Sequence, residues 1–208
     1  STARTPPCTA SYREWWCGVT PAPRREFHKL FIETELDAKR NAVFGWNRMW
    51  DIGSKRWGHW NTDFPYVSGF GTTERIESAE GEKSEFIGRY GTVRAPAALA
   101  QKTWRGLFGK HYDPVAAIRS VIDLKPGEDK AIGFAIAVGD SRAASESLLK
   151  KWLDVKAMSR ALEESKRSWI ERLAEHRIET PDRRFASFIN DWVRYQAISA
   201  RIWGRAGY

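Results

Sequence analysis

The spacing of the apolar residues changes once along this 208-residue chain, near residue 140. Before that point apolar and polar residues alternate in short segments such as 30–36, which is the period of a strand with one buried face. From Ser141 the apolar residues recur every three or four positions, which is the period of an amphipathic helix. The pattern therefore predicts a chain that is mainly β with α, an antiparallel β-sandwich followed by helices.

Turn signals separate the predicted strands. Residues 37–41 form a polar segment between two apolar runs, so residues 30–36 and 42–46 are expected to pair as a hairpin. A further strand, rich in aromatic residues, is expected over 64–72. The clearest predicted hairpin joins 116–124 to 132–138, because the Pro126-Gly127 pair between them supplies turn geometry.

The helical part has two start signals, Asp140-Ser141 and Thr180-Pro181-Asp182, and a predicted break near Asp154. We therefore expect a sandwich domain over 1–140, a helical linker over 141–179 and the first helix of a helical domain over 180–208. The apolar stripe of that last helix needs further helices to pack against, so we expect the chain to be part of a larger protein. The stripe consists of Phe185, Phe188, Ile189, Trp192, Tyr195, Ile198 and Ile202.

Composition argues against several classes of protein. No run of apolar residues approaches the ~18 needed to span a membrane, and the net charge of +8 is scattered, so neither membrane nor nucleic-acid binding is expected. Cys8 and Cys17 lack the spacing of a zinc site, and no metal site is expected. We favour two reduced thiols in a cytoplasmic protein over a disulfide that closes a short loop.

Residues 46–66 combine four Trp, two Asn and two Asp. Indole faces stack on the C–H faces of sugars, and amide groups bond to hydroxyls, so Trp57, Trp60 and Asn61 are candidate carbohydrate contacts. For any single Trp the more common role is packing between sheets or against helices, and this alternative stays open.

A second acidic segment contains Glu80, Glu82 and Glu85. A pair of carboxylates could serve as the acid and base of a glycosidase. Because these residues lie in a charge-rich stretch, we interpret the segment as a solvated loop.

Several motifs follow one another in a recognisable order. They are Trp50-Asp51, Gly58-His59-Trp60-Asn61, Phe86-Ile87-Gly88-Arg89-Tyr90-Gly91, Pro96-Ala97-Ala98-Leu99, Asp113-Pro114-Val115-Ala116-Ala117, Leu124-Lys125-Pro126-Gly127-Glu128 and Arg201-Ile202-Trp203-Gly204-Arg205-Ala206-Gly207-Tyr208. Together they resemble glycoside hydrolase family 94, which contains inverting disaccharide phosphorylases and the phosphorylase-like part of cyclic β-1,2-glucan synthases. The resemblance covers the chain from about Phe27 onward.

The resemblance implies the later part of a super-sandwich, a helical linker and the first helix of an (α/α)6 catalytic barrel. It places the general acid, an Asp, in a segment outside this chain, so no catalytic residue is expected here. It implies a β-linked disaccharide or oligosaccharide substrate, inorganic phosphate as co-substrate, no cofactor and a homodimer. Arg205 would contact the phosphate, although a helix-end Arg near the negative end of the helix dipole is the alternative. A carbohydrate-binding module without catalysis, or part of a cyclic glucan synthase, are the alternative functions.

Overall fold

The structure, a computed structural model, describes residues 8–14, 29–47, 66–110, 112–175 and 177–200. It divides into two compact units, a sandwich unit over 1–157 and a helical unit over 158–208. The strands are β1 (Cys8–Glu14), β2 (Ile32–Asp37), β3 (Ala42–Asn47), β4 (Val67–Thr72), β5 (Ser78–Glu82), β6 (Gly109–Lys110), β7 (Pro114–Val121) and β8 (Phe134–Gly139). The helices are η1 (Lys29–Phe31), α2 (Lys83–Ile87), η3 (Ala97–Ala100), α3 (Arg142–Trp152), α4 (Val155–Ala174), α5 (Arg183–Ser187), η4 (Phe188–Val193) and α6 (Arg194–Ile198).

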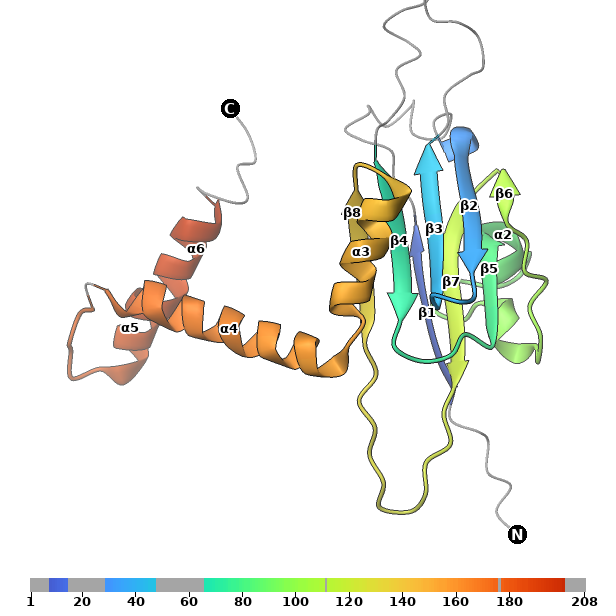
Figure 1. The fold of residues 1–208 in the computed structure, drawn as a ribbon. Coiled ribbons are helices and arrows are strands. Elements are labelled where there is room, and N and C mark those ends of the chain that lie inside the picture. Colours follow the sequence, from blue (N-terminus) through green and yellow to red (C-terminus); the bar gives the residue numbers. More distant parts are fainter. Residues whose placement is uncertain (1–7, 15–28, 48–65, 111, 176, 201–208) are drawn as a thin grey trace, which may run out of the picture. The chain divides into compact units, whose positions relative to one another are not determined.

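The strands form two antiparallel sheets that pack face to face (Figure 1). The smaller sheet has the order β1-β7-β5, and the larger has the order β6-β2-β3-β4-β8. The predicted antiparallel sandwich is therefore confirmed. A cluster of apolar side chains lies between the sheets. Alternate residues of each strand point to this inner face, where the opposite sheet covers them. The buried members of the cluster are Val43, Phe70, Ala79, Ala116 and Ile118.

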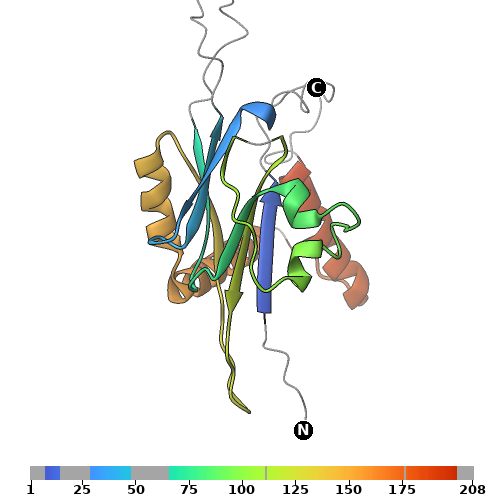
Figure 2. The same cartoon turned by 90° about the vertical axis from the view of Figure 1, so that its right-hand side faces the viewer.

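Helices cover the outer faces of both sheets (Figure 2). Helix α3 packs on β4 and β8 of the larger sheet, around Phe44, Ala137 and Leu149. On the smaller sheet, α2 and η3 pack over Val115 and Ala117. The sandwich unit thus has four layers, two of sheet and two of helix.

The hairpin predicted from the first turn signal is confirmed. Strands β2 and β3 pair from Ile32↔Asn47 to Asp37↔Ala42, with the turn between them. Asn41 ends that turn at φ +50, a conformation that Asn tolerates better than most residues. The strand expected over 64–72 corresponds to β4, and residues 64–65 lie outside the described residues.

The second predicted hairpin is wrong. The turn itself forms, with Gly127 at φ +79 and the Glu128 amide donating to the Lys125 carbonyl at 3.0 Å. However, β7 pairs with β1 and β5, whereas β8 pairs with β4 in the opposite sheet. Both edges of β7 are occupied, so the connection 122–133 crosses from one sheet to the other; it is the long loop below the sandwich in Figure 1.

Both predicted helix starts are confirmed as N-caps. The Ser141 hydroxyl accepts from the Ala144 amide at 3.1 Å, and the Asp182 carboxylate accepts from the amides of Arg184 and Phe185. The predicted break near Asp154 separates α3 from α4. Across the described ranges, each helix is too short or too polar to span a lipid bilayer.

Candidate functional site

The residues predicted to contact ligands lie outside the described residues. These are Trp57, Trp60, Asn61 and Arg205, and they remain predictions. The described residues contain three other arrangements with chemical content: a charged cluster, a buried carboxylate and an aromatic groove.

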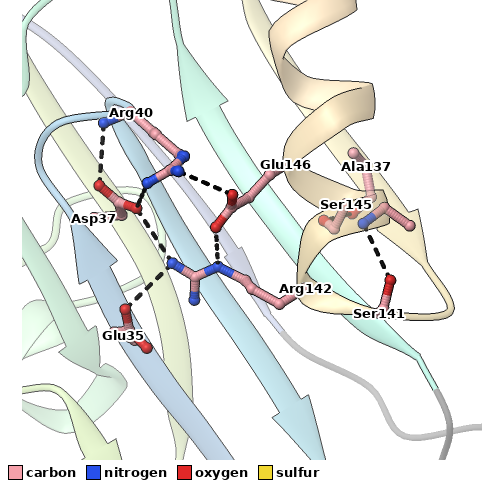
Figure 3. Close-up of polar contacts among 9 residues, drawn as sticks. Glu35, Asp37, Arg40, Ala137, Ser141, Arg142, Ser145 and Glu146 are labelled. Atoms are coloured by element: carbon pink, nitrogen blue, oxygen red, sulfur yellow. Dashed lines mark hydrogen bonds and ion pairs between the residues drawn. The ribbon is translucent and has the colours of Figure 1, made fainter.

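The charged cluster joins the β2–β3 hairpin to helix α3, and Figure 3 shows it in close-up. Arg40 contacts Asp37 at 2.7 Å and Glu146 at 3.1 Å. Arg142 contacts Glu146 at 2.7 Å. Arg142 also reaches Glu35 at 3.2 Å and Asp37 at 3.3 Å. We call these five residues the hairpin–helix cluster.

Both guanidinium groups of the hairpin–helix cluster are paired with carboxylates of the same cluster. Burial alone would raise the pKa of Asp37, but the hydrogen bonds and charge of Arg40, with the charge of Arg142, hold that pKa below its ordinary value. The Arg142 guanidinium also lies 3.6 Å from the ring centre of Phe44. Three carboxylates face two guanidinium groups, so the cluster has no positive charge left for a phosphate. Its role is to fasten α3 to the hairpin.

Small residues let α3 approach the larger sheet closely. Ser145 is buried and its hydroxyl donates to the Ala137 carbonyl at 3.3 Å. A Cβ added at Gly139 would lie 2.5 Å from the Ser145 nitrogen, and one at Gly69 would lie 2.7 Å from Leu149 Cδ1. Glycines in the sheet therefore leave room for α3 to pack closely, and ion pairs attach α3 to the hairpin.

The buried carboxylate is that of Glu80 on β5, which is 1% exposed. Its Oε1 accepts from the amides of Gly81 (3.0 Å), Glu82 (3.2 Å) and Leu107 (2.9 Å), and its Oε2 accepts from the amide of Gly106 (2.9 Å). A carboxylate that satisfies several backbone amides holds two chain segments together. Glu80 thus anchors the segment around Leu107 to β5.

The expectation of a solvated loop is wrong for two of the three acidic residues. Glu80 is buried as described, and Glu82 is also buried, its Oε1 accepting from the Ser84 amide at 3.2 Å to cap α2. Glu85 lies at the surface in an ion pair with Arg105 at 3.0 Å. Sequence reasoning missed this because the amides that satisfy Glu80 include those of residues 106 and 107, far along the chain.

The aromatic groove belongs to the helical unit, between α4 and the run α5–η4–α6. It encloses about 730 Å³ and is lined by Trp169, Leu173, Arg184, Ser187, Phe188, Asp191, Trp192 and Tyr195. The rings of Trp169 and Tyr195 lie 4.9 Å apart. We call this surface the helical groove.

Two polar side chains beside the helical groove, those of Asp191 and Asn190, have partners within the unit. The Asp191 carboxylate accepts from the Ser187 hydroxyl at 3.0 Å and contacts Arg177 at 3.4 Å. Asn190 is buried, accepts from the Ile178 amide at 2.8 Å and donates to the Ile178 carbonyl at 2.9 Å. The rings of Trp169, Phe188, Trp192 and Tyr195 make up most of the remaining lining of the groove. Within the described ranges, no three His, Cys, Asp or Glu side chains gather in a way that could hold a metal ion.

Comparison with known proteins matches residues 8–155 to the supersandwich domain of glycosyl hydrolase 94. The N,N'-diacetylchitobiose phosphorylase of Vibrio furnissii is 28% identical over 151 residues, which is 71% of this chain and 18% of that protein. The cyclic beta-(1,2)-glucan synthase NdvB of Rhizobium meliloti (strain 1021) is 28% identical over 151 residues, which is 72% of this chain and 5% of the synthase. The 3-O-beta-D-glucopyranosyl-beta-D-glucuronide phosphorylase of Paenibacillus borealis is 26% identical over 122 residues, 59% of this chain and 16% of that protein. The chain spans less than a fifth of the length of these relatives.

Proposed function

The chain belongs to glycosyl hydrolase family 94, and we propose that it is the non-catalytic sandwich and linker portion of an inverting glycoside phosphorylase. The parent protein would cleave a β-linked glucoside with inorganic phosphate and release an α-sugar 1-phosphate. The observation that carries this proposal is the match of residues 8–155 to the supersandwich domain. The similarity to a chitobiose phosphorylase supports it.

The proposed reaction is a single displacement. A phosphate oxygen attacks the anomeric carbon from the face opposite the glycosidic bond, and that bond breaks as the new C–O bond forms. A protonated carboxyl group gives its proton to the leaving sugar oxygen. This is the inverting arrangement of two facing groups, with phosphate in the place of water, and it needs no metal or organic cofactor.

The proposal assigns the catalytic acid to the rest of the parent protein and a structural role to this chain. The general acid would come from the barrel, outside this chain. The carboxylate of Glu80 is held by four amides, which supports a role for it in folding. The hairpin–helix cluster and the close approach at Gly139 support a platform role for the sandwich unit, because they hold the start of the linker firmly.

The class of reaction can be tested on the intact parent. Incubated with a β-linked disaccharide and phosphate, it should release a sugar 1-phosphate in proportion to phosphate consumed. Release of free sugar alone, at a rate independent of phosphate, would contradict the proposal.

We also propose that the parent protein is a homodimer and lies in the cytoplasm. Sedimentation of the parent tests the dimer, and fractionation of the source cells tests the location.

Arg205 is the residue of this chain that we propose for phosphate. Guanidinium is a planar, always charged fork that matches two phosphate oxygens. In the intact parent, Arg205→Ala should lower kcat/KM for phosphate by on the order of 10²-fold or more, with a much smaller change in disaccharide binding. Arg201→Ala is the matched control. If the phosphate kinetics of the Arg205 variant are unchanged, the proposal is contradicted, and Arg205 has only the structural role of a cation near the end of a helix.

The second candidate function is a carbohydrate-binding module, and the aromatic segment containing Trp57, Trp60 and Asn61 favours it. Calorimetry of the 208-residue chain with cello- and β-1,2-gluco-oligosaccharides discriminates. Millimolar or tighter binding that disappears in Trp57→Ala or Trp60→Ala would favour the module. A further alternative is that the chain is part of a cyclic β-1,2-glucan synthase, and the similarity to the synthase NdvB supports it. Formation of cyclic glucan by the parent protein would favour this alternative.

A further inference from the structure

The loop that joins α4 to α5 is tied to the helical run that follows it by one buried side chain. Asn190 is 3% exposed, and its amide group bonds to both backbone groups of Ile178. Its Oδ1 accepts from the Ile178 amide at 2.8 Å, and its Nδ2 donates to the Ile178 carbonyl at 2.9 Å. Among side chains, only those of Asn and Gln offer a carbonyl oxygen and an NH2 group together. The contact is therefore specific to the residue type at position 190.

Arg194, one turn further along, holds the end of α4. Its guanidinium donates to the carbonyls of Leu173 at 2.9 Å and Arg172 at 3.4 Å, and also to the carbonyl of Glu175. The last carbonyls of a helix have no partner within that helix and carry the negative end of its dipole. A guanidinium has several N–H donors in one plane, so it can satisfy a group of carbonyls. Arg194 is thus a cap of α4 that comes from another helix.

The two contacts lie on either side of a change in helix type. Asn190 is within η4, which is a π-helix over Phe188–Val193, and Arg194 is the first residue of α6. A π turn holds one residue more than an α turn, and π turns are frequent at functional sites. A change from one to the other would rotate the residues that follow by about 100° around the helix axis. Because both side chains are bonded at the end of α4, they fix the rotation of α6. We call Asn190 and Arg194 the α4 clamp.

The helical run held by the α4 clamp precedes Arg205 in the chain. The described part of this run continues from Arg194 to residue 200. A guanidinium binds phosphate through two N–H groups in one plane, so the contact depends on orientation as well as on distance. A misplacement of about 1 Å in an orienting group can lower a rate by about 10²-fold. Rotation of α6 would therefore misdirect Arg205 without any change in Arg205 itself.

We propose that Asn190 and Arg194 are positioning residues for phosphate, which act through Arg205 by holding the π turn and the rotation of α6. The inference rests on the proposed function, because it takes Arg205 as the phosphate contact. Neither residue of the α4 clamp is assigned a contact with phosphate. The guanidinium of Arg194 is bonded to three carbonyls, and the amide of Asn190 is bonded to Ile178.

The first test measures phosphate kinetics in the intact parent. Arg194→Ala and Asn190→Ala should each lower kcat/KM for phosphate by about tenfold or more, with less than about a twofold change in KM for the disaccharide. Arg177→Ala is the matched control, because Arg177 reaches the same helical run only through an exposed ion pair with Asp191. It should leave the phosphate kinetics unchanged. Equal losses for phosphate and disaccharide, or no loss for either, would overturn the proposal and leave the α4 clamp a purely structural contact.

The second test asks whether the effect passes through Arg205. In a parent that already contains Arg205→Ala, adding Arg194→Ala should not lower kcat/KM for phosphate further, because residues that act as a unit are not additive. Losses that multiply would overturn the proposal. If Arg205→Ala alone changes nothing, the proposed role of Arg205 fails and this inference fails with it. If Arg205→Ala lowers phosphate use and Arg194→Ala does not, only this inference fails.

The third test measures binding, and it uses a milder substitution in case the Ala variants do not fold. Arg194→Lys keeps the positive charge at the end of α4 but replaces the planar fork by a single ammonium group. Phosphate should raise the midpoint of thermal unfolding of the parent, because a ligand stabilises the folded state that binds it. The rise should be smaller in Arg194→Lys, whereas the rise caused by the disaccharide should be the same in both proteins. Equal rises with phosphate would overturn the proposal.

Discussion

The sandwich unit and the helical unit bury their side chains in opposite ways. Every buried apolar side chain of the described residues lies between Ile32 and Leu149, in the sandwich unit. In the described part of the helical unit the one buried side chain is that of Asn190, a polar residue bonded to a loop. Helix α4, twenty residues long, has no buried residue.

This difference teaches how much each unit can stabilise itself. A sheet that is covered on both faces buries apolar surface within one chain. Each Å² of apolar surface removed from water stabilises the fold by roughly 25 cal/mol. Helices that touch on one side only leave their stripes exposed: Phe185, Phe188 and Trp192 are 51%, 52% and 57% exposed. The sandwich unit therefore has a core of its own, whereas the helical unit is stabilised mainly by local hydrogen bonds and the few rings around Tyr195.

The largest expected effect is on the core of the sandwich unit. Phe70→Ala should lower the free energy of unfolding by about 3–5 kcal/mol, because it opens a cavity between the sheets. Phe188→Ala, in the helical unit, should cost less than about 1 kcal/mol, because that ring is half exposed. Urea unfolding followed by hydrogen exchange in each unit measures both. Equal losses would break the comparison.

The next effect concerns a buried charged side chain elsewhere in the sandwich unit. Glu80→Ala should cost about 3 kcal/mol, because four buried backbone amides lose their acceptor. Glu80→Gln should cost less, since the amide oxygen can still accept. Glu85→Ala is the control and should stay within about 0.5 kcal/mol, because its ion pair with Arg105 is at the surface. A harmless Glu80→Ala would show that solvent replaces the carboxylate.

The third effect tests the exposed side of the helical unit. The 208-residue chain should self-associate, because large apolar patches seldom remain bare in solution. Trp192→Glu should weaken the association by about tenfold, which corresponds to about 1.4 kcal/mol. Tyr90→Glu, on an 89% exposed residue of the sandwich unit, is the control. Light scattering measures the mass, and a monomer at high concentration would contradict the prediction.

The smallest effect is the pH dependence of the hairpin–helix cluster. The folded protein holds the pKa of Asp37 below its ordinary value of 3.8, so the ion pairs of Asp37 stabilise the fold above that value. This stabilisation is lost as the pH falls through the lower, folded pKa. Asp37→Asn should therefore cost up to about 1 kcal/mol at pH 7 and progressively less below about pH 4. Denaturant titrations across this range test it, with the exposed Asp129→Asn as control. A cost that stays constant down to pH 2 would assign it to shape rather than charge.

The sequence by itself determined the local structure of both units. Alternation and a polar turn predicted the β2–β3 hairpin, cap residues predicted the starts of α3 and α5, and Asp154 marked the break before α4. Helical spacing also predicted the apolar stripe that the structure leaves largely exposed. These features depend on residues within a few positions of one another, so the printed order of residues contains the necessary information.

Only the tertiary structure decided which elements meet. The Pro126-Gly127 turn forms as predicted, yet β7 and β8 enter different sheets, because β1 and β5 occupy both edges of β7. Glu80 is a structural anchor and not a solvated side chain, because the amides of residues 106 and 107 reach it. The hairpin–helix cluster likewise depends on Arg142 lying over residues more than a hundred positions earlier in the chain. Pairing, burial and charge neutralisation are set by distance in space, which the spacing of residues along a chain does not specify.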